Sequence, residues 1–408
     1  MGAAFIISLI LGILLLAQSA ISLRSGFRFL DYVRRCRAQP VGAYAPRAAV
    51  VIPVTGEDAS LKENLAAFMA QEYPQYDLVL VVSNESDPAF FALSALVAGA
   101  QGYGGSCKAS MVVAGLSQAQ GQKVHNLLRG LDAIDSEAEV LVFADADARP
   151  GLTWLQSLVA PLASHDVTVT TGFRWYLPGR SFVSQLRAAW DTSIATLMGE
   201  HDSSFPWGGS MAIRAEDFDR LRVRERYWKS IVSDDYALGH AVQDGGGRIR
   251  FEPRCLVASR QHSSFAEFIR WTNRQLIITR IYAPRLWAMG LAAHLLYSLA
   301  FAAGVFVLLE PASAAWERIA VAALLSVILM LGMAKGKIRA VVAGEIFPEE
   351  RECLARYGKR YWQLTLLVPW VMLWNFVVAG FARTIEWSGV HYRLRSSREV
   401  EIIGRDSH

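Results

Sequence analysis

The sequence has few cysteines and few charged residues for its length. Its four cysteines, at positions 36, 107, 255 and 353, are widely separated and form no CxxC pair, so neither a disulfide framework nor a zinc site is expected. Reduced thiols in a protein that faces the cytosol are the simpler interpretation. Charged residues make up only 19% of the 408 residues, and a net charge of +4 gives no argument for binding nucleic acid.

Hydrophobic residues, in contrast, make up 53% of the chain, which is more than in a typical soluble protein. Residues 3–23 carry no charge and are numerous enough for a helix that crosses a bilayer. A cleaved signal peptide is the alternative, but no basic residue precedes this apolar run. Several arginines follow it, so the positive-inside rule places the N-terminus outside and the next domain in the cytoplasm. We therefore predict a membrane anchor at residues 1–24.

The segment 45–285 has the pattern of an α/β domain. Helical patterns, for example at 61–71 and 122–131, alternate with short apolar runs, which predicts a mainly parallel, Rossmann-like sheet covered by helices. Ligands of such sheets bind beyond the carboxyl ends of the strands. The runs that indicate buried strands are 48–53, 77–82, 110–114, 139–144 and 166–171.

The C-terminal region becomes apolar again. Runs at 286–309, 319–333 and 362–381, each flanked by basic residues, predict about three membrane helices within 286–382. The stretch 338–347 is predicted to lie in the membrane interface as an amphipathic segment. One crossing before the α/β domain and three after it would put the basic tail, 383–408, outside. That contradicts the positive-inside rule unless a late segment re-enters or lies flat.

Two acidic motifs carry the candidate chemistry. Asp145 and Asp147 follow the fourth predicted strand, where both carboxylates can reach one Mg²⁺ or Mn²⁺ that offsets the charge of a diphosphate. Solvated or capping aspartates are the alternative. Asp234 and Asp235 precede a predicted helix at 236–243, where N-capping is the ordinary role. Sugar transfer with inversion needs a base for the acceptor hydroxyl, and a carboxylate suits that role.

A third motif, Arg270-Trp271, comes directly before the C-terminal apolar block. Arginine can pair with a diphosphate through its planar fork, and tryptophan can line a slot for the head group of an acceptor. An ordinary Arg/Trp belt beside a membrane helix is the alternative.

The order of these motifs resembles that of glycosyltransferase family 2-like enzymes with the GT-A fold. It is most similar to the ceramide glucosyltransferases of family 21 and their hopanoid-type bacterial relatives. The resemblance runs along most of the chain, and each motif alone is weak, but all occur in the family's order. The segments that carry it are 52–58, 64–65, 73–74, 86–89, 123–126, the pair Asp145 and Asp147, the residues Gly208, Ser210 and Arg214, and the segments 234–236, 270–271 and 392–395.

The resemblance implies an inverting hexosyltransferase that moves a sugar from a UDP-sugar to a ceramide-like lipid at the cytoplasmic membrane face. It implies a divalent cation as cofactor and no nucleic-acid partner, with Asp235 as the base. The other catalytic residues that it implies are Asp234, Arg270 and Trp271. The donor-binding residues are Pro53, Thr55, Glu57, Asn84, Glu85, Lys123, Asn126 and Asp145. The acceptor side has Trp207, Gly208 and Ser210, and the metal ligands are Asp147 and Asp145.

The sequence departs from the family pattern at three positions. Glu267 stands where the last signature usually has Gln or Arg, Asn84 replaces an acid that helps hold the nucleotide base, and Asp234 replaces the commoner Glu. A processive polysaccharide synthase is the second candidate function, but it would need a translocation channel and more membrane helices. A non-enzymatic membrane sensor is the third, and it would not need the full acidic set. The sequence does not determine the sugar or the lipid.

Overall fold

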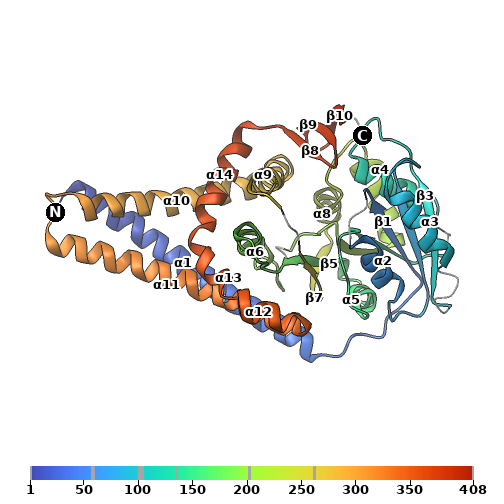
Figure 1. Cartoon of the computed structure of the whole chain (residues 1–408), viewed down its shortest axis with the longest axis horizontal. Helices are drawn as coiled ribbons and strands as arrows, with labels where there is room; N and C mark the ends of the chain where they lie inside the picture. The colour runs from blue at the N-terminus through green and yellow to red at the C-terminus, as the bar shows by residue number, and fades with distance from the viewer. Residues whose placement is uncertain are drawn as a thin grey trace. The chain divides into compact units, whose positions relative to one another are not determined.

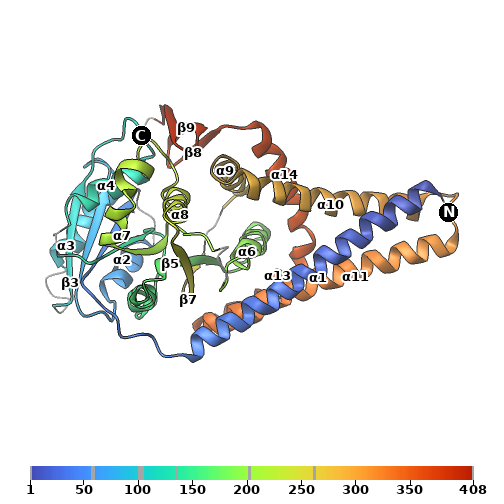
Figure 2. The same ribbon diagram turned by 180° about the vertical axis from the view of Figure 1, so that it is seen from behind.

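The computed structural model covers the whole chain and describes residues 2–56, 60–99, 105–134, 137–200, 204–260 and 263–406. Its contacts divide the chain into two units. The sheet unit comprises residues 33–175, 198–259 and 383–408, and the helical unit comprises residues 1–32, 176–197 and 260–382. Figure 1 shows the elements of both units, and Figure 2 shows them from behind.

The sheet unit is built on a seven-stranded sheet with the order β3-β2-β1-β4-β6-β5-β7. β3, β2, β1 and β4 are parallel to one another, whereas β6 runs antiparallel to both β4 and β5. Its strands are β1 (Ala48–Val54), β2 (Tyr76–Val82), β3 (Cys107–Val113), β4 (Val140–Ala144), β5 (Val167–Tyr176), β6 (Ser210–Arg214) and β7 (Arg248–Ser259). Its helices are α2 (Leu61–Met69), α3 (Ala89–Gly99), α4 (Gln122–Leu131), α5 (Trp154–Val159), α7 (Ala215–Arg220) and α8 (Asp234–Asp244). The predicted α/β class with a mainly parallel sheet is confirmed.

The central strands form where the sequence has runs of almost entirely apolar residues. All seven residues of β2 and all five of β4 are buried, as expected for parallel strands that are covered on both faces. Trp154 of α5 and Phe68 of α2 pack edge to face in the core on one side of the sheet, with ring centroids 5.3 Å apart. Because β1 is parallel to both β2 and β4, the carboxyl ends of all three strands lie at one edge of the sheet.

The C-terminal segment is a folded part of the sheet unit and forms a second, antiparallel sheet. Its strands are β8 (Thr384–Trp387), β9 (Val390–Ser396) and β10 (Glu399–Arg405). The hydroxyl of Tyr392 accepts a hydrogen bond from the backbone N–H of Gln122 (3.0 Å), and Arg405 donates to the carbonyl of Ser117 (2.5 Å). Both views show these strands beside the start of α4 (Figures 1 and 2).

The helical unit contains most of α1 and all of the helices after the seventh strand. Among its described residues, α1, α10 and α11 are long and apolar enough to cross a membrane. They lie alongside one another, and Phe5, Leu15, Val321 and Ile328 share one apolar cluster (Figure 1). The helices are α1 (Ala3–Ala38), α6 (Phe182–Ala195), α9 (Phe265–Tyr282), α10 (Pro284–Leu309), α11 (Ala315–Ile346), α12 (Arg351–Tyr357), α13 (Arg360–Gln363) and α14 (Val368–Phe381).

Two of the predicted C-terminal segments differ in detail from the structure. The stretch 338–347 is not a separate amphipathic segment, because α11 continues without a break to Ile346. The predicted membrane helix at 362–381 is bent by 56° between residues 360–366 and α14, so it is either a broken span or a re-entrant loop. Pro369 lies in the first turn of α14, where its missing N–H costs no helical hydrogen bond, so it favours a new helix start at that point.

Candidate active site

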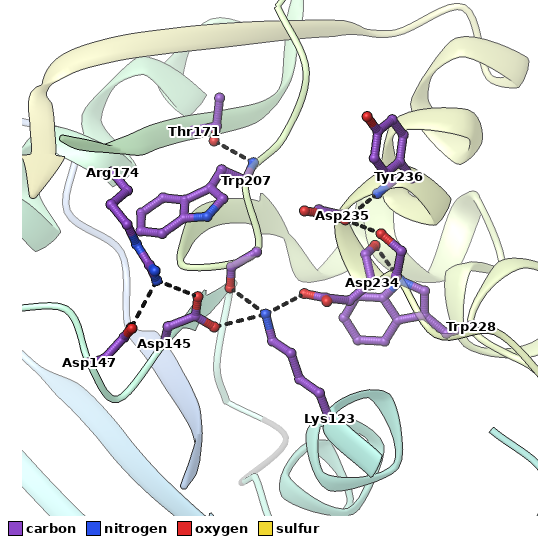
Figure 3. A network of polar contacts seen from close by, with 12 residues as sticks. Lys123, Asp145, Asp147, Thr171, Arg174, Trp207, Trp228, Asp234, Asp235 and Tyr236 are labelled. Carbon is purple, nitrogen blue, oxygen red and sulfur yellow. Dashed lines mark hydrogen bonds and ion pairs between the residues drawn. The ribbon is translucent and has the colours of Figure 1, made fainter. Parts of the chain in front are cut away.

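The sheet topology brings five segments to one edge. Asp145 directly follows β4, and the loop before β6 lies beside it because Ala144 pairs with Ser210 in antiparallel register. β5 is antiparallel to β6, so its carboxyl end, with Arg174, lies at this same edge. The first turns of α4 and α8 supply Lys123 and Asp234. Figure 3 shows these side chains pointing toward one another.

Lys123 is the centre of this cluster. Its ammonium lies 2.8 Å from Oδ1 of Asp145 and 3.2 Å from Oδ2 of Asp234, and it donates to the carbonyl oxygen of Gly208 at 3.2 Å. Only 15% of the Lys123 side chain and 1% of the Asp234 side chain are exposed. A buried charge needs paired groups of this kind, since an isolated one is strongly disfavoured. Lys123 therefore joins two acidic motifs that are far apart in the sequence.

The cluster shifts the pKa values of its members. Burial by itself would lower the pKa of Lys123, but Asp145, then Asp234 and Asp235, outweigh it and hold that pKa above its usual value. Burial raises the pKa of Asp234 to about 7, although the nearby Lys123 opposes this. Strongly shifted groups that gather at a sheet edge are typical of functional sites.

Asp147 and Asp145 converge on a second cation, Arg174. One guanidinium nitrogen of Arg174 lies 2.9 Å from Oδ1 of Asp147 and 3.4 Å from Oδ2 of Asp145. The guanidinium also lies over the ring of Trp207, 5.2 Å from its centroid. Burial is the largest cause of a raised pKa at Asp147, and Arg174 opposes it. The two predicted metal ligands thus share a single cation position.

The other acidic pair opens α8, which begins two residues earlier than predicted. Ser233 is the N-cap residue, so neither aspartate caps the helix, and both lie in the first turn, where the helix dipole favours negative charge. Oδ1 of Asp235 accepts hydrogen bonds from the hydroxyl of Ser233 and from the N–H of Tyr236 (2.7 Å). Within the described residues, Oδ2 of Asp235 accepts none, and the side chain is half-buried. Asp235 therefore presents one oxygen to an incoming group.

The loop before β6 contributes its backbone more than its side chains. A Cβ at Gly208 would collide with the carboxylate of Asp234 and the ammonium of Lys123, so the chain approaches the cluster closely only because this residue is glycine. The N–H of Trp207 donates to Thr171 (2.9 Å). Ser210 was predicted on the acceptor side, but it is fully buried and its hydroxyl accepts from the indole of Trp154, so it supports the loop from the core.

The predicted donor-binding residues lie at the carboxyl ends of β1 and β2. Pro53 is in β1 and Thr55 follows it with an exposed side chain, while Asn84 and the exposed Glu85 follow β2. Oδ1 of Asn84 accepts from Ser86 at 2.6 Å. Glu57 lies outside the described residues, so nothing tests its prediction.

Asn126 differs from the other predicted donor contacts because it is fully enclosed. It is 1% exposed, accepts a hydrogen bond from Gln122 (2.8 Å) and donates one to Ser83 (3.3 Å). The bond with Gln122 lies within α4, and the bond with Ser83 connects α4 to the end of β2. Asn126 therefore holds the helix that carries Lys123 against the strand.

Arg270 and Trp271 belong to α9 in the helical unit. Trp271 is half-buried and stacks on the guanidinium of the buried Arg187, 4.9 Å from the ring centroid, while Arg270 is exposed. Trp190 packs against Trp271 at 5.3 Å and donates through its indole N–H to Asn375. Their predicted catalytic roles remain predictions.

Glu267, one turn earlier in α9, explains a departure from the family pattern. Its carboxylate accepts from the N–H of Ser264 (2.7 Å), and the Ser264 hydroxyl in turn accepts from the N–H of Glu267 (3.3 Å). This is a capping box, which stabilises the start of a helix. Glu267 therefore stabilises the start of α9, which accounts for an acidic residue at this position.

Sequence reasoning missed two residues of the cluster. Arg174 lies beyond the predicted end of the fifth strand at residue 171, because β5 continues to Tyr176. An arginine between Phe173 and Trp175 at the end of a strand is a signal that could have identified it. Trp228 was also missed, and its indole N–H donates to the backbone carbonyl of Asp234 (3.0 Å), which anchors the start of α8.

A sequence model of glycosyl transferase family 21 matches residues 9–400, nearly the whole chain. The chain belongs to glycosyl transferase family 21. Family membership and the strand order together confirm the predicted resemblance and the GT-A class of fold. The enzyme is thus a glycosyltransferase, and its described residues include three helices that are long and apolar enough to cross a membrane.

Two solved structures with a similar chain path are also glycosyltransferases. One is the mannosyltransferase PcManGT from Pyrobaculum calidifontis in complex with GDP-Man and Mn²⁺, which is 17% identical, with 88% of this chain and 98% of that chain covered and a TM-score of 0.44. The other is glucosyl-3-phosphoglycerate synthase from Mycobacterium tuberculosis in complex with Mn²⁺, UDP and phosphoglyceric acid. It is 18% identical, with coverages of 62% and 81% and a TM-score of 0.40.

Proposed function

We propose that this family 21 enzyme transfers a hexose, with inversion, from a UDP-sugar to a ceramide-like membrane lipid at the cytoplasmic face. The observation that carries the proposal is the Lys123 cluster, in which a buried ammonium joins Asp145 of one motif to Asp234 of another. A charged donor needs fixed cations and carboxylates at one edge of a sheet, and acid–base chemistry needs a carboxylate beside them.

For the donor, we propose that the diphosphate binds near Asp145 and Asp147 together with Mg²⁺ or Mn²⁺. The fit is supported by the two carboxylates, whose oxygens approach a single guanidinium nitrogen and can therefore approach a single cation. Carboxylate oxygens are the ligands that these hard cations prefer, and a bound cation would offset the charge of the leaving diphosphate. Lys123 supplies a further positive charge, and Pro53, Thr55, Asn84 and Glu85 line the strand ends proposed for the nucleotide.

For the acceptor, we propose Asp235 as the base. Its Oδ1 is held by Ser233 and Tyr236, which fixes the carboxylate and leaves Oδ2 to accept the proton of the lipid hydroxyl. The oxygen then attacks the anomeric carbon on the face opposite the diphosphate, which inverts that centre. Asp234 is less suited to this role, because its carboxylate is buried against Lys123.

The membrane arrangement of the proposal follows the charge pattern. We propose an anchor at 1–24, a cytoplasmic transferase domain at 45–285, membrane helices within 286–382 and a basic C-terminal segment at 383–408. Trp207 and Gly208 are proposed to guide the acceptor. Arg270 and Trp271 of the helical unit are proposed to be catalytic residues. The apolar helices keep the enzyme at the surface in which a lipid acceptor is dissolved.

The substrates can be tested directly. Purified full-length enzyme is incubated with a panel of UDP-sugars and a total lipid extract, and the products are identified by mass spectrometry. We expect one hexose added to one lipid class, with the opposite anomeric configuration to the donor. A long polymer would identify a processive synthase instead, and the absence of any UDP release would contradict a transferase that uses UDP-sugars.

The base is tested by replacing Asp235→Asn. We expect transfer to fall by about 10³-fold, within the range of general-base contributions, while UDP affinity changes little because Asp235 does not contact Lys123 directly. The matched control is Asp219→Asn, which removes an exposed carboxylate from α7 and should leave the rate unchanged. Near wild-type transfer by the Asp235 variant would show that the base is another residue, with Asp234 the next to replace.

A further inference from the structure

Arg174 occupies an unusual position in the candidate active site. It extends from the end of β5 between Asp145 and Asp147, and only 12% of its side chain is exposed. The ring of Trp207 lies against the guanidinium on one side, as Figure 3 shows. The side chain is therefore held in place by stacking as well as by charge.

The contacts of Arg174 coincide with those expected of a bound cation. The same nitrogen lies within 3.4 Å of one oxygen from each aspartate, so both oxygens face one point. A divalent cation would bind the same carboxylate oxygens of Asp145 and Asp147 that accept hydrogen bonds from the guanidinium here. Among the described residues, no three His, Cys, Asp or Glu side chains form a metal-binding group, so phosphate or water oxygens would have to complete the coordination of a metal.

We propose that Arg174 holds the cation position of the donor-free enzyme, and that a divalent cation with a nucleoside diphosphate displaces it. The proposal rests on the function proposed above. Lys123 and Arg174 already face the carboxylates of Asp145, Asp147 and Asp234, so a dication that enters alone meets two positive charges. A diphosphate brings the negative charge that offsets this repulsion, which makes the binding of metal and donor cooperative. Arg174 is thus a positioning residue that couples the two ligands.

The test measures Mn²⁺ binding by electron paramagnetic resonance of the free ion, on full-length enzyme in detergent, with and without UDP. Without UDP, we expect the Arg174→Gln variant to bind Mn²⁺ about tenfold more tightly than the wild type, since the competing cation is gone. UDP should raise the Mn²⁺ affinity of the wild type more than that of the variant. Equal or weaker Mn²⁺ binding by the variant without UDP would overturn the proposal.

Three further variants make the test specific. Arg149→Gln removes the same charge two residues after Asp147, where Arg149 pairs with Glu63 at 2.6 Å, and it should leave Mn²⁺ affinity within about twofold of the wild type. Asp147→Asn should weaken Mn²⁺ binding. If Arg174→Gln does not fold, Arg174→Lys takes its place in the test. Lysine keeps the charge but loses the planar fork, so this variant should also bind Mn²⁺ more tightly than the wild type without UDP, by a smaller factor.

The outcomes separate this inference from the proposed function. If UDP and Mn²⁺ bind together in all variants but Arg174→Gln gains nothing without UDP, only the role of Arg174 is wrong. If neither wild type nor variant binds Mn²⁺ in the presence of UDP, the proposed donor and cofactor are wrong, and the role of Arg174 is overturned with them.

Discussion

Two buried cations of this enzyme, Lys123 in the sheet unit and Arg187 in the helical unit, have very different surroundings. Lys123 faces carboxylates, at 2.8 Å and 3.2 Å. Arg187, 3% exposed, lies over the rings of Trp271, Tyr176 and Phe268 at 4.9 to 6.0 Å.

The difference teaches what each cation can do. A charged ligand that binds nearby changes the electrostatic interaction between Lys123 and its carboxylate partners, so the electrostatic potential at Lys123 depends on what is bound. Aromatic rings carry no net charge, so their attraction for Arg187 does not depend on a bound anion. Lys123 is therefore suited to substrate binding, and Arg187 to holding Trp271 in one orientation.

The largest effect is expected from Lys123→Met. The change leaves Asp145 and Asp234 facing each other without their shared cation, which should lower the stability of the sheet unit by about 3 kcal/mol and abolish detectable transfer. Thermal melting and UDP binding measure the two effects. The double variant Lys123→Met with Asp234→Asn should recover much of the melting temperature but no activity. Full activity in either variant would show that the cluster serves only stability.

Arg187→Met should have a smaller effect of a different kind. Losing the contacts with the three rings should cost about 1–2 kcal/mol and lower the melting temperature, while UDP affinity stays unchanged. Arg187→Lys is the matched control, since it keeps the charge but packs less well on rings. A loss of UDP affinity as large as that of the Lys123 variant would remove the distinction between the two cations.

The melting temperature should depend on pH through Asp234, the buried carboxylate that pairs with Lys123, which further distinguishes Lys123 from Arg187. The pKa of Asp234 is raised to about 7 in the folded enzyme from 3.8, so its protonated form contributes stability below about pH 4. That contribution is lost as pH rises through about 7, where the buried carboxylate ionises. The melting temperature should therefore fall between about pH 4 and pH 7 in the wild type and fall less in Asp234→Asn. If the melting temperatures of the wild type and of Asp234→Asn change equally with pH, the raised pKa of Asp234 is contradicted.

The smallest effect is expected from Tyr392→Phe. Removing the hydroxyl leaves the N–H of Gln122 without this acceptor at the start of α4, one residue before Lys123, at a cost of about 1 kcal/mol. We expect kcat/KM to fall by a few-fold, with a melting temperature slightly below that of the wild type. Tyr357→Phe in the helical unit is the control that removes a hydroxyl elsewhere. An unchanged kcat/KM would show that the C-terminal sheet does not position Lys123.

The sequence predicted the parts of the fold that local pattern determines. β1 and β4 are unbroken apolar runs, and β2 is apolar except for Asp77. α4 has the predicted bounds because its apolar positions recur with helical spacing. β7 was not predicted, because it has charged residues at alternate positions near its start. The C-terminal strands were missed for a similar reason, since basic residues alternate with apolar ones there and suggested a tail.

The acidic residues of the site were predictable, but their partners were not. Aspartates at strand and helix ends indicate a polar site, whereas the choice of partner depends on three-dimensional packing. Asp145 and Asp234 share Lys123 only because α4 and α8 begin at the same edge of the sheet. Arg174 reaches the metal motif only because β5 is longer than its apolar run.

The C-terminal sheet also has a consequence for the path of the chain through the bilayer. Tyr392 and Arg405 bond to the loop before α4, and the N–H of Val400 donates to the carbonyl of Ser230, so this end of the chain is in the same aqueous compartment as β1 to β7. The polypeptide between β7 and β8 must then traverse the lipid an even number of times. α10 and α11 are two candidate passages, and an even number then requires the bent segment 360–381, which is either a broken span or a re-entrant loop, to be re-entrant. A tag after Arg405 and a tag in the sheet unit should therefore be accessible to the same impermeant reagent.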